Sequence, residues 1–361
     1  MTGQSSKSRF LRIGYDAAPL LDAPTGVGRY AGELARALTE RGVEIVRFAV
    51  SWGAPRAEGV RRWRIPARLA RAAWRRWDRP PIERLTGRVD LVHATNFVLP
   101  ALKDTPGVVT VHDLSFLRDD TWPGGHRLRD LVPWSVERAA AVIVPTHAIA
   151  AEVCVRLRVP EPKVHVTPEG VAPVFFGAGA LGEAALAHLG IGGPFVVAAG
   201  TIEPRKNLPV LLEAWRRVQG ELDGWTLVLA GPKGWGPDLP PTPGVLPVGW
   251  IGDETLPGLL AAAEIFCYPS LYEGFGLPPL EAMAAGTPAV VGRYSAAEEV
   301  LGDAAVLVDP HDPGGFAEAL RTLGTDAALR RSYVVAGKAH AAGYTWSRTA
   351  ATTIDAYRSI S

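Results

Sequence analysis

Residues 271–291, LYEGFGLPPLEAMAAGTPAVV, decide the fold because they lead from a strand into a helix through a glycine loop. The apolar run AEIFCYPS just before them is typical of a buried strand that ends in a loop. Pro278 and Pro279 have a fixed φ and no N–H, so they suit the first turn of a helix, which Gly286 then ends. The stretch therefore predicts a strand, a glycine loop and a helix start, in that order.

Two glutamates, Glu273 and Glu281, bracket the loop that contains Gly274 and Gly276. Unpaired N–H groups at a helix N-terminus bind anions, and a loop with little side-chain bulk lets a diphosphate approach them. Glu281, expected in the first helical turn, has the alternative role of complementing the helix dipole, worth ~0.3–1 kcal/mol. Glu273 gains nothing comparable beside an anion, so it needs neutral donors such as sugar hydroxyls. The loop predicts a ligand that is part phosphate and part polyol.

The segment EGFGLPPLE resembles the E-x7-E motif of retaining GT-B glycosyltransferases of family four, the glycosyl transferases group 1. The resemblance extends over nearly the whole chain. It implies that Glu273 holds the hydroxyls of the donor sugar and that Glu281 holds the nucleotide ribose. It also implies that the backbone of Gly274, Phe275, Gly276 and Leu277 faces the diphosphate. A purely structural loop is the alternative.

Composition indicates an ordinary globular protein, with 361 residues, 47% of them apolar and 21% charged. At ~100–200 residues per domain, two domains are expected. No apolar stretch approaches the ~18 residues of a spanning helix, and the polar N-terminus lacks the apolar core of a secretion signal. Cys154 and Cys267 form no Cys-x-x-Cys pair, so neither a disulfide nor a zinc site is indicated. We expect a cytoplasmic protein, peripheral at the inner face of the membrane if its basic segment binds lipid.

Strand and helix patterns alternate along the chain, which favours an α/β fold with parallel sheets. The expected strands are residues 10–15, 89–93, 107–112, 141–144, 163–166, 195–200, 225–230, 245–248, 265–268, 289–291 and 305–308. The resemblance implies a GT-B fold, in which two Rossmann-like doubly wound domains face a cleft and a C-terminal helix crosses back. We expect an acceptor-binding domain over 1–172, a nucleotide-sugar-binding domain over 173–345 and the returning helix over 346–361.

A second glycine loop precedes the pattern TGVGRYAGELARAL and places Gly26 and Gly28 at a helix start. The next glycine is Gly32, which departs from the G-x-G-x-x-G spacing of dinucleotide folds and counts against NAD. A tight turn that needs glycine is the alternative to a ligand site. The resemblance implies that this loop lies near the donor phosphate and the acceptor.

Ligands of parallel sheets bind outside the carboxyl ends of the strands, where His112 and Asp113 are expected. His93 occupies a similar position, and a satisfied structural histidine is the alternative for either residue. The HDLSF segment resembles the family around its cleft histidine, which favours His112. The resemblance assigns acceptor binding to Asp16, Gly26, His112 and Asp113.

Arg205 and Lys206 lie in a loop between a predicted strand and a helix for which Asn207 is the expected N-cap. This loop falls at the same sheet edge as Glu273. Solvated surface cations are the alternative interpretation. The pair resembles the Arg/Lys pair that binds the donor diphosphate in the family. The loop GPKGWG at 231–236 is expected to be flexible and to border the nucleotide, with no role assigned to it.

Residues 61–77, RRWRIPARLARAAWRRW, contain seven arginines and three tryptophans and no acidic residue. This composition suits an anionic partner, and Pro66 interrupts its helical pattern. No nucleic-acid-binding signature accompanies it, so we expect no nucleic-acid partner. We favour an anionic lipid surface or a pyrophosphate-lipid acceptor; a solvated basic face packed on the sheet is the alternative.

The predicted reaction is transfer of a hexose with retention of configuration, as the resemblance implies. The catalytic residues are expected to be His112, Arg205, Lys206 and Glu273. No Asp-x-Asp pair occurs in the sequence, so we expect activity without a metal and no cofactor besides the nucleotide-sugar substrate. Likeness to bacterial polysaccharide mannosyltransferases favours GDP-mannose as donor, followed by UDP-sugars, and a glycan, lipid-linked or small-molecule acceptor. A sugar-nucleotide epimerase and a non-catalytic nucleotide-sugar-binding module are the alternatives.

Overall fold

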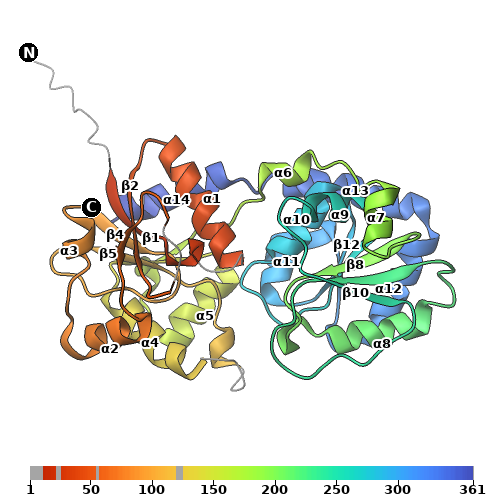
Figure 1. Ribbon diagram of the computed structural model, residues 1–361, viewed down its shortest axis with the longest axis horizontal. Coiled ribbons are helices and arrows are strands. Elements are labelled where there is room, and N and C mark those ends of the chain that lie inside the picture. The colour runs from red at the N-terminus through yellow and green to blue at the C-terminus, as the bar shows by residue number, and fades with distance from the viewer. Residues whose placement is uncertain (1–10, 22–25, 54–56, 119–124, 361) are drawn as a thin grey trace, which may run out of the picture. The chain divides into compact units, whose positions relative to one another are not determined.

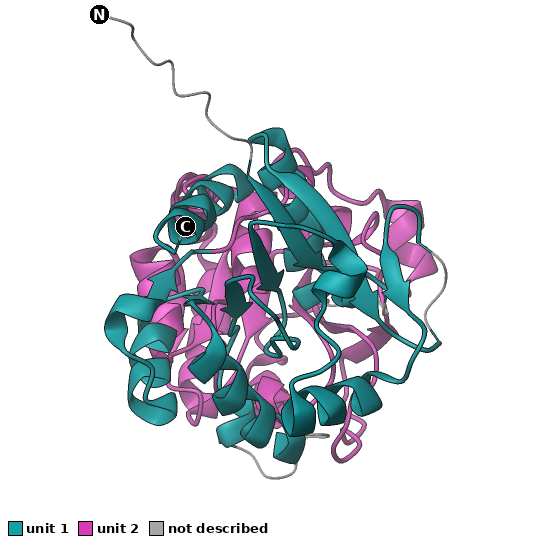
Figure 2. Cartoon of the chain, turned by 90° about the vertical axis from the view of Figure 1, so that its left-hand side faces the viewer, with its two compact units in different colours: residues 1–168, 346–361 teal, residues 169–345 magenta. Residues whose placement is uncertain are grey.

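The structure is a computed structural model that describes residues 11–21, 26–53, 57–118 and 125–360. The chain forms two compact units, one of residues 1–168 with 346–361 and one of residues 169–345 (Figure 2). The sequence placed the boundary after residue 172 instead. The difference arises because Val171 pairs with Thr345 of the second unit, which draws the segment before it into that unit.

The first unit is built on a sheet of seven parallel strands in the order β3-β2-β1-β4-β5-β6-β7 (Figure 1). Its strands are β1 (Arg12–Asp16), β2 (Glu44–Val50), β3 (Arg61–Trp63), β4 (Leu91–Ala94), β5 (Gly107–Thr110), β6 (Ala141–Val144) and β7 (Val164–Val166). Its helices are α1 (Gly26–Glu40), α2 (Ala67–Trp77), α3 (Glu83–Thr86), α4 (Gly125–Arg138), α5 (His147–Leu157) and α14 (Trp346–Arg358), with short 3-10 turns η1 (Ala18–Leu20), η2 (Ser115–Leu117) and η3 (Glu161–Lys163).

Both faces of this sheet are covered, as the alternation of side chains along its strands requires. Ile13 and Tyr15 of β1 are buried in one cluster with α1 and α14. Val46 and Phe48 of β2 are buried in another cluster with Trp74 of α2. The predicted terminal helix is confirmed: α14 packs against α1 of the first unit.

The second unit is built on a sheet of six parallel strands in the order β10-β9-β8-β11-β12-β13. Its strands are β8 (Phe195–Ala199), β9 (Thr226–Ala230), β10 (Val245–Gly249), β11 (Ile265–Tyr268), β12 (Ala289–Gly292) and β13 (Val306–Val308). Its helices are α6 (Pro173–Phe176), α7 (Glu183–His188), α8 (Leu208–Val218), α9 (Leu256–Ala262), α10 (Leu277–Ala285), α11 (Ser295–Leu301), α12 (Pro313–Thr325) and α13 (Ala327–Ala341), with the turns η4 (Pro204–Lys206) and η5 (Gly302–Ala304).

Helices cover this sheet on two sides as well. Helices α8 and α12 pack together on one face, and α10 packs with α9 and α13 on the other (Figure 1). Both sheets are doubly wound, since the strand order reverses between β1 and β4 in one and between β8 and β11 in the other. In such sheets the crevice outside the carboxyl ends of these paired strands is the usual ligand site.

The fold class predicted from the sequence is confirmed, and several boundaries are corrected. The first strand begins at Arg12, and Phe10 lies outside the described residues. Strand β5 ends at Thr110, because the chain turns away from the sheet before His112. The basic segment forms an edge strand and then a helix, separated at Pro66, which has no N–H for an uninterrupted helix. None of the helices in the described ranges has the length and apolar character needed to cross a bilayer.

Candidate active site

The reversal point of the second sheet brings together Arg205, Lys206 and Glu273. The two cations lie in η4, which follows β8, and Glu273 lies in the loop that follows β11. These strands are neighbours although they are far apart in the sequence. The cations and the carboxylate therefore meet at one edge of the sheet, as predicted.

Glu273 is the centre of a compact network. Its Oε1 accepts hydrogen bonds from Lys206 Nζ at 2.7 Å, Ser270 Oγ at 2.9 Å and Tyr268 Oη at 3.0 Å. Its Oε2 accepts from Nη1 of Arg205. The carboxylate thus holds the two cations in place, whereas the sequence argument assigned it to sugar hydroxyls alone.

A second acid and an aromatic ring complete the surroundings of the cations. Arg205 Nη2 donates to Glu203 Oε1 at 2.8 Å, and its Nη1 donates to the backbone oxygen of Tyr272 at 3.1 Å. Lys206 Nζ also donates to Tyr268 Oη and lies 4.6 Å from the centre of that ring. The four charged side chains are only 12–18% exposed, so they are not mere solvated surface charges.

The network keeps Glu273 ionised. Burial alone would raise the pKa of its carboxyl, but the charges of Arg205 and Lys206 outweigh burial and hold that pKa at about 2. Burial lowers the pKa of Lys206, and the Glu273 carboxylate opposes that shift. The pair therefore depends on both members being present, since either charge alone is costly in a site that excludes water.

Glu273→Gln is expected to lower the free energy of unfolding by on the order of 3 kcal/mol at pH 7. Because the pKa is lower in the folded protein, this stabilisation is complete above about pH 4.5 and disappears as the pH falls to about 2. Urea unfolding between pH 7 and pH 3 checks this. The control is Glu298→Gln, which removes an exposed ion pair with Arg293. A difference between wild type and Glu273→Gln that is independent of pH would contradict the prediction.

The helix that follows the loop begins as predicted. Gly276 is the N-cap of α10 with φ 108°, a conformation that favours glycine, and Gly286 ends the helix with φ 98°. Phe275 is buried against the ring of Tyr344 at 5.7 Å, so only its backbone is available to a ligand.

Glu281 differs from the prediction, because it is the fifth residue of α10 and lies beyond its first turn. The helix begins at Leu277, one residue before the two prolines, so Glu281 follows a complete first turn. The dipole effect is confined to the first turn. A dipole role therefore does not explain this carboxylate, which is only 2% exposed.

Tyr294 is a residue that the sequence reasoning missed. Its Oη is buried and has no hydrogen-bond partner among the described residues. It would lie 3.4 Å from a Cβ atom at Gly276, which places it beside the N-terminus of α10. Burial, and then the charge of Glu273, raise the pKa of Tyr294, so it remains a neutral hydroxyl. No spacing signal connects it to the loop, because it follows a different strand.

The structure corrects the N-cap role predicted for Asn207 and places the 231–236 loop beside Ile202. Asn207 precedes α8, but its side chain donates to the backbone oxygens of Pro269 and Pro310, at 3.1 and 2.6 Å, and makes no capping bond. The 231–236 loop is hydrogen-bonded to Ile202, whose N–H donates to Pro232 and whose oxygen accepts from Gly234. The amide of Asn207 thus holds the end of η4, and the backbone of Ile202 pairs with the 231–236 loop, whose expected flexibility stays a prediction.

The reversal point of the first sheet carries the predicted acceptor residues. Asp16 ends β1, and its Oδ1 accepts from the N–H of Ala18 at 2.9 Å. Thr95, just after β4, donates to the backbone oxygen of Asp16 at 2.9 Å and accepts from His112 Nε2 at 2.9 Å through its own backbone oxygen. Asp16, Thr95 and His112 therefore form a connected row across three neighbouring strands.

Gly26 and Gly28 begin α1, as predicted. One turn later the ring of Tyr30 packs edge-on against that of His112, with 4.7 Å between ring centres. Asp113 has a local structural contact, because its Oδ1 accepts from the N–H of Ser115 at 2.8 Å at the start of η2.

The two candidate histidines differ in environment. His93 is fully buried, with its ring nitrogens 2.7 Å from Tyr357 Oη and 2.8 Å from Thr110 Oγ1. Burial, and then the charge of His112, lower the pKa of His93 to about 3, so it stays neutral. His112 is partly exposed. His93 is therefore a structural histidine with its hydrogen bonds satisfied in the core. His112 is the histidine of the two that a ligand can reach.

No group of three or more His, Cys, Asp and Glu side chains suited to a metal occurs in the described part of the chain. Two doubly wound domains with charged side chains at their reversal points are typical of proteins that bind nucleotides. The comparisons with known proteins identify the family within this class.

Family models match both halves of the chain: "Glycosyltransferase Family 4" over residues 24–174 and "Glycosyl transferases group 1" over residues 193–326. The O-antigen chain mannosyltransferase B of Escherichia coli is 30% identical over 292 residues, which cover 74% of each protein. The sucrose-phosphate synthase of Thermosynechococcus elongatus has the same fold, with a TM-score of 0.75, 20% identity and coverage of 96% of this chain and 98% of that one.

A structure of the Anabaena protein HepE with UDP-glucose also has this fold, with a TM-score of 0.68, 17% identity and coverage of 96% and 99% of the two chains. The chain belongs to the glycosyl transferases group 1, glycosyltransferase family 4. It is a glycosyltransferase with the GT-B fold.

Proposed function

We propose that this enzyme transfers a hexose from a nucleotide sugar, with GDP-mannose as the preferred donor and UDP-sugars next, to a glycan, lipid-linked or small-molecule acceptor. The observation that carries the proposal is the meeting of Arg205, Lys206 and Glu273 beside the N-terminus of α10. Cations and the N–H groups of a glycine loop that leads into a helix suit a diphosphate, and a carboxylate suits sugar hydroxyls. The preference for mannose is supported by the named activity of the Escherichia coli relative.

In the proposed mechanism, the site stabilises the departing diphosphate. Lys206 carries three N–H donors, and Tyr268 and Glu273 engage two of them. Lys206 and Arg205 are thus held in place before the donor binds, which lowers the cost of reorganisation in the transition state. The third N–H donor of Lys206 is proposed to bind a phosphate oxygen, and the second lone pair of Glu273 Oε2 is proposed to accept from a sugar hydroxyl, while Glu273 keeps both cations in position. The buried hydroxyl of Tyr294 supplies one more donor beside Gly276.

Retention of configuration and independence of metal follow from this mechanism as proposals. The leaving phosphate assists in removing the proton of the acceptor hydroxyl, so no protein nucleophile is required, and Glu273 orients the sugar. In the first unit, Asp16, Gly26, His112 and Asp113 are proposed to bind the acceptor. In the second unit, donor binding is proposed for the cluster, the 274–277 backbone and Glu281. Gly26 and Gly28 of the first unit are proposed to contribute N–H groups to the donor phosphate.

The donor is tested by thermal unfolding with GDP-mannose, UDP-glucose, GDP, UDP and NAD. A ligand that binds only the folded state stabilises it by about 2.7 kcal/mol at a hundred times its dissociation constant. We expect the largest rise in melting temperature with GDP-mannose, a smaller rise with UDP-glucose and none with NAD. A rise with NAD, or none with any nucleotide sugar, would overturn the proposal.

Turnover separates the enzyme classes. A transferase releases GDP faster when an acceptor glycan is added, whereas an epimerase converts the nucleotide sugar without an acceptor, and a binding module does neither. We expect acceptor-dependent release of GDP that continues in excess EDTA. The anomeric signals in the NMR spectrum of the product should show the same configuration as in the donor. Loss of activity in EDTA that added Mg²⁺ or Mn²⁺ restores would contradict metal independence.

We propose an anionic membrane surface as the partner of α2, which would place the enzyme peripherally at the cytoplasmic face of a membrane. Leu69 is 59% and Trp77 is 66% exposed, whereas Trp74 of the same helix is buried in the core. Arg68 and Arg76 are exposed on α2 as well. An exposed helix face with both arginine and large apolar residues is typical of helices that lie at a lipid interface.

Sedimentation with liposomes checks this partner. We expect the protein to sediment with liposomes that contain phosphatidylglycerol and to remain in solution with phosphatidylcholine alone. Replacing Arg68 and Arg76 with glutamine should weaken binding by about 2 kcal/mol, since each arginine near an anionic surface contributes about 1 kcal/mol. Equal binding by the wild type and the double variant would rule out this role.

A further inference from the structure

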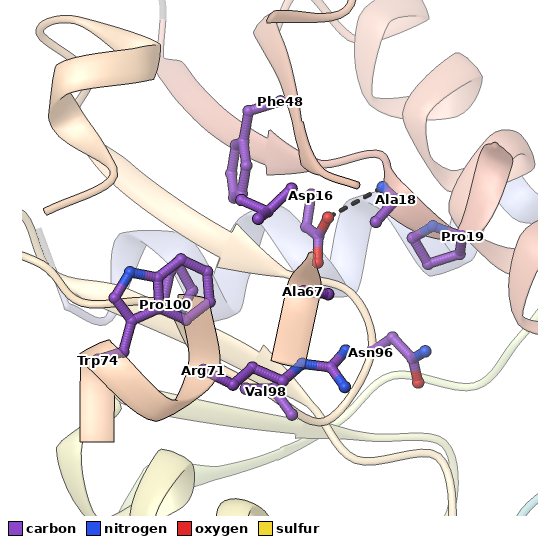
Figure 3. A pocket seen from close by; sticks show the side chains of 11 residues that line it. Asp16, Ala18, Pro19, Phe48, Ala67, Arg71, Trp74, Asn96, Val98 and Pro100 are labelled. Atoms are coloured by element: carbon purple, nitrogen blue, oxygen red, sulfur yellow. Dashed lines mark hydrogen bonds between the residues drawn. The ribbon is translucent and has the colours of Figure 1, made fainter. Parts of the chain in front are cut away.

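The first unit contains a pocket at the reversal point of its sheet (Figure 3). It has a volume of about 80 Å³ and is lined from β1, β2, α2 and the loop after β4. One water needs ~10–15 Å³ of such volume, so the pocket has room for several waters or for one edge of a sugar ring. Among its lining residues, the sequence reasoning named Asp16 as a site residue and placed Ala67, Arg71 and Trp74 in the basic segment 61–77.

Three polar side chains from separate elements line this pocket: Asp16, Arg71 and Asn96. Asp16 comes from the end of β1, Arg71 from α2 and Asn96 from the loop after β4 (Figure 3). Oδ1 of Asn96 is buried and has no hydrogen-bond partner in the described part of the chain. A buried polar atom without a partner is costly, at about 1–3 kcal/mol, so a ligand that pairs with it gains affinity.

The remaining wall is largely apolar and includes Phe48, Trp74 and Pro100. The Trp74 indole cannot supply a polar contact, because its Nε1 donates to the backbone oxygen of Pro80 at 3.0 Å. A ligand must therefore combine an apolar face with polar groups at its edge. The C–H faces and hydroxyl edges of a sugar or cyclic polyol meet this requirement.

The polar groups also select a neutral ligand. Arg71 only donates hydrogen bonds, the Asp16 carboxylate only accepts them, and the amide of Asn96 does both. A hydroxyl group donates and accepts, so one hydroxyl can pair with Oδ1 of Asn96 and its neighbour with the remaining capacity of Asp16 or Arg71. A phosphate dianion carries mostly acceptor oxygens and negative charge, which neither the Asp16 carboxylate nor Oδ1 of Asn96 can bind, since both only accept.

We infer that this pocket binds the hydroxyl edge of the acceptor, a neutral sugar or cyclic polyol, with Arg71 and Asn96 as specificity-determining residues beside Asp16. The inference rests on the proposed function, because it identifies the chemistry of the acceptor. Asn96 follows Thr95, whose backbone oxygen accepts from His112 Nε2. Neighbouring strands are about 4.8 Å apart, so a ring held over β1 and β4 reaches towards His112 beyond β5.

Ligand-observed NMR tests this inference with methyl α-mannoside, myo-inositol and inorganic phosphate as probes. We expect saturation transfer to one or both of the neutral probes at about 50 mM, above the millimolar dissociation constants that a few hydrogen bonds provide. For inorganic phosphate, we expect the width of the ³¹P line to be the same with the wild type and with the pocket variants. Asn96→Leu removes the unpaired amide and Ala67→Met fills the pocket from α2. Each should reduce the transfer at least about fivefold.

The control is Arg75→Gln, which removes a cation of α2 that pairs with Asp130 and lies outside the pocket. Absent transfer to both neutral probes, equal transfer in the pocket variants and wild type, or phosphate binding that Ala67→Met abolishes would each overturn the inference. Thermal shifts with GDP-mannose keep the two proposals apart. If the donor proposal is wrong, the wild type and all variants show no thermal shift with GDP-mannose. If only this inference is wrong, the thermal shift with GDP-mannose remains in all of them.

Discussion

Replacing Lys206 with alanine is expected to lower kcat by about 10²- to 10³-fold, the usual effect of removing one preorganised charge that stabilises a transition state. Lys206 is held by Glu273 and Tyr268 before any donor binds. Its ammonium group is proposed to meet the negative charge that develops on the departing diphosphate. The measurement is kcat with saturating donor, together with the melting temperature of the variant.

Stability must be followed in the same variant, because Glu273 loses one of its two cationic partners. Arg205 and Ser270 still donate to that carboxylate, so we expect a folded protein with a lower melting temperature. Arg205→Ala should also abolish turnover but should destabilise more, since Arg205 also donates to the backbone of Tyr272 and to Glu203.

The matched control is Lys103→Ala, which removes a 75% exposed lysine of the first unit where it pairs with Asp104 at 3.3 Å. Exposed pairs contribute little, so its kcat and melting temperature should match the wild type. Normal kcat in Lys206→Ala and Arg205→Ala would refute the assignment of the diphosphate to this cluster.

Glu281→Ala is expected to raise the dissociation constant of the nucleotide sugar by about 10- to 100-fold, with a smaller effect on kcat. Hydrogen bonds to a charged group contribute about 1.5–3 kcal/mol, and the two hydroxyls of a ribose are the proposed donors. Glu281 lies in α10 and is buried, so a titration of donor binding must be paired with a measurement of unfolding.

Glu281→Gln keeps the size of the side chain and removes its charge, which separates ribose binding from packing. We expect it to weaken donor binding, and its unfolding measured in the same buffer separates that effect from any loss of stability. Glu298→Ala on α11 is the surface control, because it removes only an exposed pair with Arg293. Donor affinity that is unchanged in both Glu281 variants would exclude a role in holding the nucleotide.

The arrangement of the cluster shows where sequence reasoning reached its limit. Charge type and position after a strand were enough to select Arg205, Lys206 and Glu273, because parallel strands end at a common edge. The same reasoning assigned Glu273 to a sugar alone, since pairing between side chains in different loops leaves no spacing signal. Tyr294 was missed for that reason, although its buried hydroxyl lies beside Gly276.

The acceptor side shows the same division. His93 and His112 both follow apolar strand patterns, and position did not separate them by itself. Burial and two hydrogen bonds assign His93 to the core. Arg71 belonged to the basic segment 61–77 and Asn96 to no motif. They line one pocket with Asp16 only because α2 and the loop after β4 converge there.

The sequence by itself determined the alternation of strands and helices, the two parallel sheets, the start of α10 and the charged residues at the strand ends. These are local properties, set by side-chain periodicity, by glycine and proline geometry and by the order of elements along the chain. Tertiary structure alone decided which charges pair with Glu273, which histidine is buried and which side chains enclose the pocket. Such contacts join residues from different loops, and their geometry depends on the packing of whole helices against the sheets.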